Sequence, residues 1–251
     1  MGVTWFENAS GFLQVLYPKW NTQAAPEEWE KINWTEPDES AIIKLCTEML
    51  AYKVKLCPTL VLSDQVMQHP DNWNPHNKVS KSVSSDFQLN EHWQAAAGYI
   101  DDARKQLGLL LAFTKKVSKI YFDMGGTVVT GTDTPGGIHS YPGAALHREL
   151  ELFVEIGFTE MEALQAATIK AAESIGLTDR GVIDKGKLAD LIVLSENPLT
   201  DIKNTQAIDL VIKGGEVYTQ DEILAHVPNP ADTFERYEKF IGEFEKIMRV
   251  Q

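Results

Sequence analysis

The chain has 251 residues, of which 43% are hydrophobic and 24% are charged, and its formal net charge is −13. This length suits one large domain or two small ones with a sizeable core. The negative charge disfavours binding to nucleic acid or to an anionic membrane surface, because both are polyanions. No apolar run reaches the roughly 18 residues that a membrane-spanning helix requires, so we expect no membrane span.

Strands and helices alternate through the first 180 residues. The predicted strands are Val3–Glu7, the stretch "VKLCPTLVL" (54–62) and Thr127–Asp133. The predicted helices are a segment capped by Asp38, a long segment from Asn90 to about Met124, one starting near Tyr141, and Glu160–Ile175 with a capping box of Thr159 and Glu162. This alternation indicates an α/β fold with parallel strands covered by helices.

The C-terminal part follows a different pattern. The segments "ADLIVL" (189–194) and Ile208–Thr219 predict short strands, and Gly214-Gly215 predicts a two-residue hairpin turn between antiparallel strands. Since parallel barrel strands need helical crossovers, we expect these strands to form a small β-element outside the parallel layer. An amphipathic pattern then predicts a last helix at about Ala231–Val250.

Asp133 ends the strand-like stretch of "TVVTGTDTPGG" (127–137). Such an aspartate can serve the turn itself, because its carboxylate can accept backbone N–H bonds two residues further on. It can also be a reactive group, because the functional side chains of parallel α/β folds lie at the carboxyl ends of strands. The residues alone leave both interpretations open.

Few other residues suggest reactive chemistry. His139 lies six residues after Asp133 in the same predicted loop and either lines the same pocket or lies outside it. The six histidines contain no HxH or HxxxH spacing, so no pair of them is predicted to share a metal ion, and His147 is expected to be solvated or packed. Cys46 and Cys57 are expected to be buried core thiols rather than a redox pair.

Several blocks of the chain together resemble one enzyme family. They are "GTDTPGG", "ALHRELELFVEIGFTEMEALQAATIKAAESIGL", "GVIDKGKLADLIVLSENPLTDI" and "IDLVIKGGEVY". These blocks, spanning Thr127–Tyr218, resemble the C-terminal half of the amidohydrolase superfamily, and most of all its imidazolonepropionase-like and prolidase-like branch. A weaker resemblance covers Gly2–Leu62.

The resemblance implies part of a TIM (β/α)₈ barrel, with about strands six to eight present, followed by a small β-sandwich element and a C-terminal helix. It divides the chain into barrel residues 1–180, β-sandwich strands 181–220 and a helical tail 221–251.

The resemblance also implies a divalent metal centre, with zinc as the expected metal. Asp133 corresponds to the family's strand-eight aspartate, which binds the metal and handles the proton of the attacking water. His139 matches a loop histidine that faces substrate in some relatives. The family's HxH pair, bridging residue and strand-five histidine have no counterparts here, and Asn8 follows Glu7 where relatives carry a histidine. The ligand set of this chain is therefore expected to be incomplete.

Two functional hypotheses follow. The first is the C-terminal fragment of a metal-dependent amidohydrolase that hydrolyses an amide or cyclic amide C–N bond of a small-molecule substrate with metal-activated water, inactive as this chain alone. Such a fragment is expected to associate with itself or to depend on a missing N-terminal half. The second is a non-catalytic, degenerate half-barrel paralogue that binds a partner or ligand. The sequence does not indicate a cellular compartment.

Overall fold

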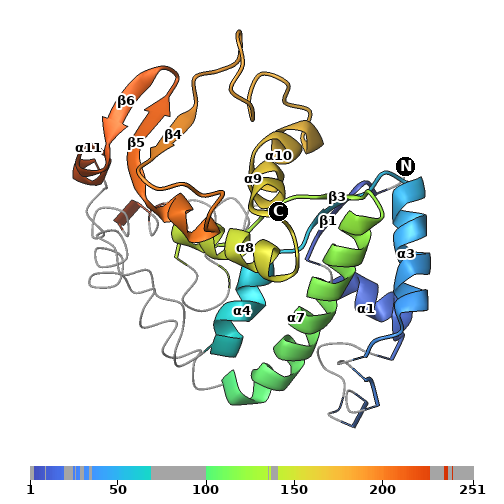
Figure 1. Cartoon of the computed structure of the whole chain (residues 1–251). Coiled ribbons are helices and arrows are strands. Elements are labelled where there is room, and N and C mark those ends of the chain that lie inside the picture. The colour runs from blue at the N-terminus through green and yellow to red at the C-terminus, as the bar shows by residue number, and fades with distance from the viewer. Residues whose placement is uncertain are drawn as a thin grey trace.

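The fold is a mixed α/β structure with one parallel and one antiparallel sheet (Figure 1). The computed structural model describes residues 3–8, 10–19, 25, 27–28, 31–33, 36–68, 100–134, 136, 141–226, 235–236 and 239. Within these residues, no helix combines the length and the apolar composition that crossing a membrane requires.

The parallel sheet has three short strands in chain order. Strand β1 (Trp5–Glu7) pairs with β2 (Lys55–Cys57), and β2 pairs with β3 (Thr127–Val128), with Trp5 opposite Lys55 and Lys55 opposite Thr127. Because all pairings are parallel, the carboxyl ends of the three strands meet at one edge of the sheet. The predicted parallel α/β arrangement is confirmed for these segments.

Helices surround this sheet. They are α1 (Ser10–Leu16), α3 (Glu39–Ala51), α4 (Leu60–Gln68), α7 (Ile100–Asp123), α8 (Ala144–Glu155), α9 (Glu160–Ala167) and α10 (Ile169–Ser174). Figure 1 shows α3 beside α7, with α8 and α9 on the other side of α7. The core between them includes fully buried Ile42, Leu56, Phe113 and Phe153, and the Tyr121 hydroxyl donates to the carbonyl of Val54 at 2.7 Å.

The second sheet is antiparallel and separate, as predicted from its hairpin. Strand β5 (Ile208–Lys213) lies between β4 (Leu191–Leu194) and β6 (Glu216–Thr219). Gly214 and Gly215 make the turn with φ of 60° and 89°, which two-residue hairpins require and glycine adopts without strain. The short 3₁₀ helix η1 (Ile202–Gln206) packs against α8, and α11 (Gln220–Ala225) follows β6.

Several predicted strands are shorter in the structure: the one predicted at Val3–Glu7 spans Trp5–Glu7, and the one predicted at 189–194 spans Leu191–Leu194. The strand predicted at 54–62 ends at Cys57, and helix α4 begins at Leu60. Pro58 has no N–H to continue the ladder, so the chain leaves the sheet there. The strand predicted at Thr127–Asp133 pairs only over Thr127–Val128, and the residues after it form the loop that carries Asp133.

The helix predictions are confirmed in place but not in all bounds. Asp38 caps α3 by accepting from the N–H groups of Ser40 and Ala41, and Thr159 and Glu162 form the predicted capping box. The helix predicted at Glu160–Ile175 is two helices, because Thr168 has a non-helical backbone between α9 and α10. The helix expected near Tyr141 begins at Ala144 after Gly143.

Most of the predicted C-terminal helix, 231–250, lies outside the described residues, as does the segment 90–99 of the predicted long helix.

Candidate functional site

The three parallel strands all lead into left-handed backbone. Asn8 follows β1 with φ of 52°, Thr59 follows β2 with φ of 47°, and Asp133 lies in the loop after β3 with φ of 51°. Among the described residues other than glycine, only Lys53, in the turn after α3, shares this conformation. Strained non-glycine backbone is typical of functional sites, and here it gathers at one sheet edge. We therefore take the carboxyl edge of the parallel sheet as the candidate site.

The first two strand ends are joined by hydrogen bonds. The Thr59 hydroxyl donates to Asn8 Oδ1, and the Asn8 N–H donates to the Cys57 carbonyl at 3.0 Å. Thr59 is buried, Asn8 is half-buried, and the contact between them is partly buried. The side-chain oxygen of Asn8 therefore already accepts a hydrogen bond from Thr59, which follows β2. Asn8 is the residue at which relatives of the family carry a histidine.

Asp133 is exposed at this edge. Its main-chain carbonyl accepts the N–H of Gly136 at 2.7 Å and closes the turn. Within the described part of the chain, its carboxylate takes no hydrogen bond, so the turn does not depend on that group. The Asp133 carboxylate is therefore an exposed group at the sheet edge, 3.5 Å (Oδ2) from the position of a Cβ atom added at Gly136.

The loop of Asp133 rests on the turn that follows β2. A Cβ atom added at Gly131 would overlap the sulfur of Cys57 and would lie 3.4 Å from Thr59 Cγ2. A Cβ atom added at Gly136 would lie 3.5 Å from Leu62 Cδ1. The two glycines therefore let the loop pack directly against this turn, on both sides of Asp133.

A buried glutamate, Glu149, forms hydrogen bonds with the residues that follow Thr59. Glu149 of α8 is 0% exposed, and its two carboxylate oxygens accept the N–H groups of Leu60 at 3.0 Å and Val61 at 2.7 Å. These N–H groups open helix α4, and the first N–H groups of a helix have no partner within the helix. Burial raises the pKa of Glu149 to about 8, although the two N–H donors oppose the rise.

Cys57 is not an activated nucleophile. Burial raises the pKa of its thiol well above the usual value, and the nearby carboxylates of Glu7, Glu149 and Asp133 raise it further. A thiol must ionise to act as a nucleophile or to bind a metal. The prediction that Cys46 and Cys57 are buried core thiols is confirmed, since both are free and buried.

Neither of the two histidines that the structure describes, His147 and His226, is placed at this edge. His139 lies outside the described residues, so its predicted place near substrate is not tested. His147 is packed rather than catalytic: its Nδ1 lies 2.9 Å from Thr205 Oγ1 of η1, and burial lowers its pKa. His226 is exposed at the end of α11.

The described residues do not fit a complete metal centre. Across the described ranges, no three His, Cys, Asp or Glu side chains come together in a way that could hold a metal ion. Catalytic zinc usually takes three protein ligands. Asp133 is the one predicted ligand that the sheet edge presents, so a metal centre of the family's kind would need ligands from outside the described residues.

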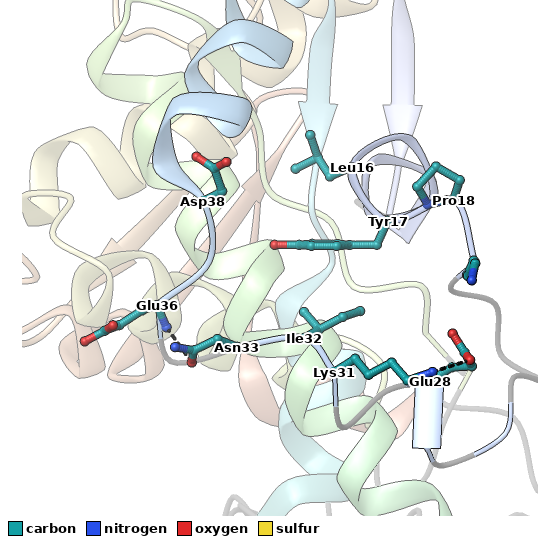
Figure 2. A pocket seen from close by; sticks show the side chains of 10 residues that line it. Leu16, Tyr17, Pro18, Glu28, Lys31, Ile32, Asn33, Glu36 and Asp38 are labelled. Atoms are coloured by element: carbon teal, nitrogen blue, oxygen red, sulfur yellow. Dashed lines mark hydrogen bonds and ion pairs between the residues drawn. The ribbon is translucent and has the colours of Figure 1, made fainter.

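A pocket of about 620 Å³ lies elsewhere, between the end of α1 and the start of α3 (Figure 2). Its lining includes Tyr17, whose ring makes an edge contact with Phe113, and none of the three strand-end residues. Among its charged groups, Lys31 lies 2.6 Å from Glu28, and Asp38 caps α3.

Sequence reasoning missed two parts of the site. Thr59 sits inside what seemed a strand, and its left-handed backbone has no local signal. Glu149 did leave a signal in the sequence: it falls on the same helical stripe as the buried Ala145, Leu152 and Phe153. A glutamate in an apolar stripe is rarely buried without partners, and it predicts a buried carboxylate with donors nearby.

Comparisons with known proteins agree with the resemblance. The amidohydrolase family model matches residues 58–218. Ochratoxinase of Aspergillus niger is 42% identical over 102 residues, which cover 38% of this chain and 20% of that enzyme. Imidazolonepropionase of Deinococcus deserti is 38% identical over 84 residues, which cover 33% of this chain and 21% of that enzyme. The matches thus span about a fifth of the length of these curated relatives.

Solved structures show the same likeness. A putative prolidase from Bifidobacterium longum has a TM-score of 0.54 at 26% identity, covering 68% of this chain and 39% of that one. A bottromycin amidohydrolase has a TM-score of 0.58 at 18% identity, covering 87% of this chain and 46% of that one, and supports the fold alone. Its relatives include imidazolonepropionases and a putative prolidase, and with the family model matching more than half of its residues, the chain belongs to the amidohydrolase family.

Proposed function

We propose that this chain forms the C-terminal part of a hydrolase that cleaves an amide-type C–N bond in a small molecule. One observation carries the proposal. In a chain of the amidohydrolase family, the Asp133 carboxylate stands exposed at the carboxyl edge of the parallel sheet and is not used by its own turn. Hydrolysis of a C–N bond needs such a group, because a proton must leave the attacking water and reach the departing nitrogen.

Asp133 would perform both proton steps. Its carboxylate would accept a proton from the water that attacks the carbonyl carbon. The resulting carboxylic acid would then donate that proton to the nitrogen as the C–N bond breaks, which restores the carboxylate. The exposed position lets substrate reach the group, and the packed glycine loop keeps it in place. His139, if it lines this edge, would contact the substrate rather than the water.

The proposal includes a divalent metal, with zinc first, in the complete enzyme. The described residues do not gather its ligands, so we expect the purified chain alone to retain less than one equivalent of zinc after dialysis and to show no turnover. Within the same proposal, residues 1–180 belong to the barrel as about strands six to eight, residues 181–220 to the β-sandwich and residues 221–251 to a helical tail.

A substitution in the complete coding sequence tests the proposal. The open reading frame that contains this chain is determined, and the protein it encodes is assayed by chromatography on a panel of N-acyl amino acids, dipeptides and cyclic amides. Asp133→Asn should lower kcat by about 10²-fold or more, because the proton acceptor is lost. The matched control is Asp123→Asn, an exposed aspartate that pairs with Lys119 at the end of α7. An Asp133→Asn protein as active as this control would refute the role.

One observation favours a second candidate, a non-catalytic protein that binds a small ligand or partner. The side-chain oxygen of Asn8 already accepts a hydrogen bond from Thr59, and asparagine is a weaker metal ligand than histidine. Zinc retention separates the two candidates. Stoichiometric zinc in the complete protein, lost in Asp133→Asn, supports the hydrolase, whereas a complete protein without zinc or turnover supports the binding protein.

A further inference from the structure

We infer that Glu149 is a positioning residue for the candidate site: it fixes the turn Thr59–Leu62, and through this turn it sets the place of the Asp133 loop. The inference rests on the proposed function of Asp133 and assigns a further residue to the same site. It follows from contacts that join three segments far apart in the sequence.

The first contact is between Glu149 and the start of α4. The carboxylate accepts from Leu60 and Val61, residues 89 and 88 positions away, one N–H to each oxygen. Glu149 is fully buried, so water does not replace either bond. The first N–H groups of a helix have no partner within the helix, and the two carboxyl oxygens of Glu149 supply one acceptor to each of these two. The first turn of α4 is thereby held at a defined distance from α8.

The second contact is between this turn and the neighbouring strand ends. Thr59 has its strained backbone directly before Leu60, and its hydroxyl donates to Asn8 after β1. A residue with φ of 47° keeps that conformation only when its surroundings hold it. The hydrogen bonds from the N–H groups of Leu60 and Val61 to Glu149 stabilise this conformation of Thr59. Loss of them would let Thr59 relax toward ordinary backbone and would turn its hydroxyl away from Asn8.

The third contact is between the turn and the loop after β3. Gly131 packs against Cys57 and Thr59, and Gly136 packs against Leu62, so Asp133 is bracketed by two points of support on one turn. The Gly136 N–H also closes the loop onto the Asp133 carbonyl at 2.7 Å. A shift of the Thr59–Leu62 turn must therefore move or loosen the loop that carries Asp133. Glu149 acts on Asp133 through this turn and has no direct contact with it.

A second buried glutamate on α8, Glu151, provides a control for the role of Glu149. Glu151 is also buried, at 6% exposure, but it accepts from Arg148 at 3.0 Å and from Gln206 at 3.3 Å and touches neither the turn nor the loop. Glu151→Gln is therefore the matched control for Glu149→Gln: the same helix, the same substitution and similar burial, without the contact in question.

The test uses amide resonances of the full chain in solution and needs no catalytic activity. Glutamine offers one acceptor oxygen in place of two, so Glu149→Gln should speed hydrogen exchange of Leu60 and Val61 by about tenfold or more. It should also shift the amide resonances of Gly131 and Gly136, which a purely local loss of stability in α8 would leave in place. Glu151→Gln weakens the ion pair with Arg148 but keeps both bonds from Glu149, so its effect on these amides should be much smaller than that of Glu149→Gln.

Two results would overturn the inference. The first is a Glu149→Gln variant in which the Leu60 and Val61 amides exchange at the wild-type rate and the Gly131 and Gly136 resonances keep their wild-type positions. The other is an equal effect of Glu151→Gln, which would mean general destabilisation of α8.

If Glu149→Gln does not fold, the wild-type chain still decides the question. Its Leu60 and Val61 amides should exchange at least about 100-fold more slowly than Ile169 and Lys170, which open α10 behind a Thr168 that makes no side-chain cap. Equal exchange rates at the two helix starts would contradict the stabilisation of the α4 start by Glu149. Because none of these measurements uses turnover, a failure of the positioning role would leave the proposed hydrolysis intact. An inactive Asp133 site would likewise leave the positioning role testable.

Discussion

Arg148 offers the most direct test of how the site is anchored. Its guanidinium binds Asp64 of α4 with two bonds, Nε to Oδ2 at 2.8 Å and Nη2 to Oδ1 at 3.1 Å, and its Nη1 binds Glu151 at 3.0 Å and Glu155 at 2.7 Å. Burial lowers the pKa of Arg148, but the bonds and charges of Asp64 and Glu155 outweigh it and raise the pKa. The guanidinium therefore joins α8 to α4 as a permanent charge.

Arg148→Met should remove the charge and keep much of the side-chain length. The side chains of Asp64 and Glu151 are only 7% and 6% exposed, so they would remain as buried carboxylates without their cation. Breaking a buried pair from one side costs about 3–5 kcal/mol. We expect the lower end, about 3 kcal/mol, because Gln68 still donates to Asp64 at 2.5 Å. With a urea m-value of about 3 kcal/mol/M for a chain of this size, the midpoint should fall by about 1 M.

Urea unfolding followed by circular dichroism at pH 7 measures this midpoint. Lys170→Met is the control, because Lys170 and Glu173 form an exposed pair whose loss should cost less than about 1 kcal/mol. Adding Asp64→Leu to Arg148→Met should restore part of the stability, since the double variant no longer buries an unpaired Asp64. A midpoint for Arg148→Met within about 0.3 M of wild type, or a double variant no more stable than the single one, would refute the reasoning.

Three further predictions follow from the same contacts. Because the folded pKa of Glu149 is about 8 and the ordinary value is 4.5, the folded state keeps this proton longer, so stability should fall as pH rises from about 4.5 to 8. Urea midpoints across this range measure the fall, which Glu149→Gln should remove; an equal slope in that variant would contradict it. Gly131→Ala should cost about 1–3 kcal/mol in thermal unfolding because its Cβ would meet the Cys57 sulfur, whereas Gly11→Ala, with open space around it, should not destabilise the chain. Finally, two apolar side chains of the antiparallel sheet are exposed, Ile192 at 53% and Val217 at 56%. Strands β1 and β3 are the edge strands of the described parallel sheet. Because exposed apolar surface and open strand edges favour association, the isolated chain should self-associate. Size-exclusion chromatography with light scattering tests this, and a monodisperse monomer with one sharp unfolding transition would count against it.

Local signals in the sequence determined most of the secondary structure. Asp38 and the pair Thr159–Glu162 mark helix starts because their side chains bond to N–H groups within three residues. Gly214-Gly215 determines a hairpin because only glycine adopts both backbone conformations freely. The alternation of strands and helices indicated the parallel sheet, and the sequence blocks around Asp133 were enough to predict the family that the comparisons show.

Tertiary structure alone decided how the site is built. The start of α4 depends on Glu149, which lies 89 residues from Leu60, so no local window of sequence contains the interaction. The strain at Thr59 depends on contacts with Asn8 and with the loop after β3, which meet only when three parallel strands align. The surroundings of Asp133 likewise became visible only in the fold, where its carbonyl closes its turn and its carboxylate is exposed at the sheet edge.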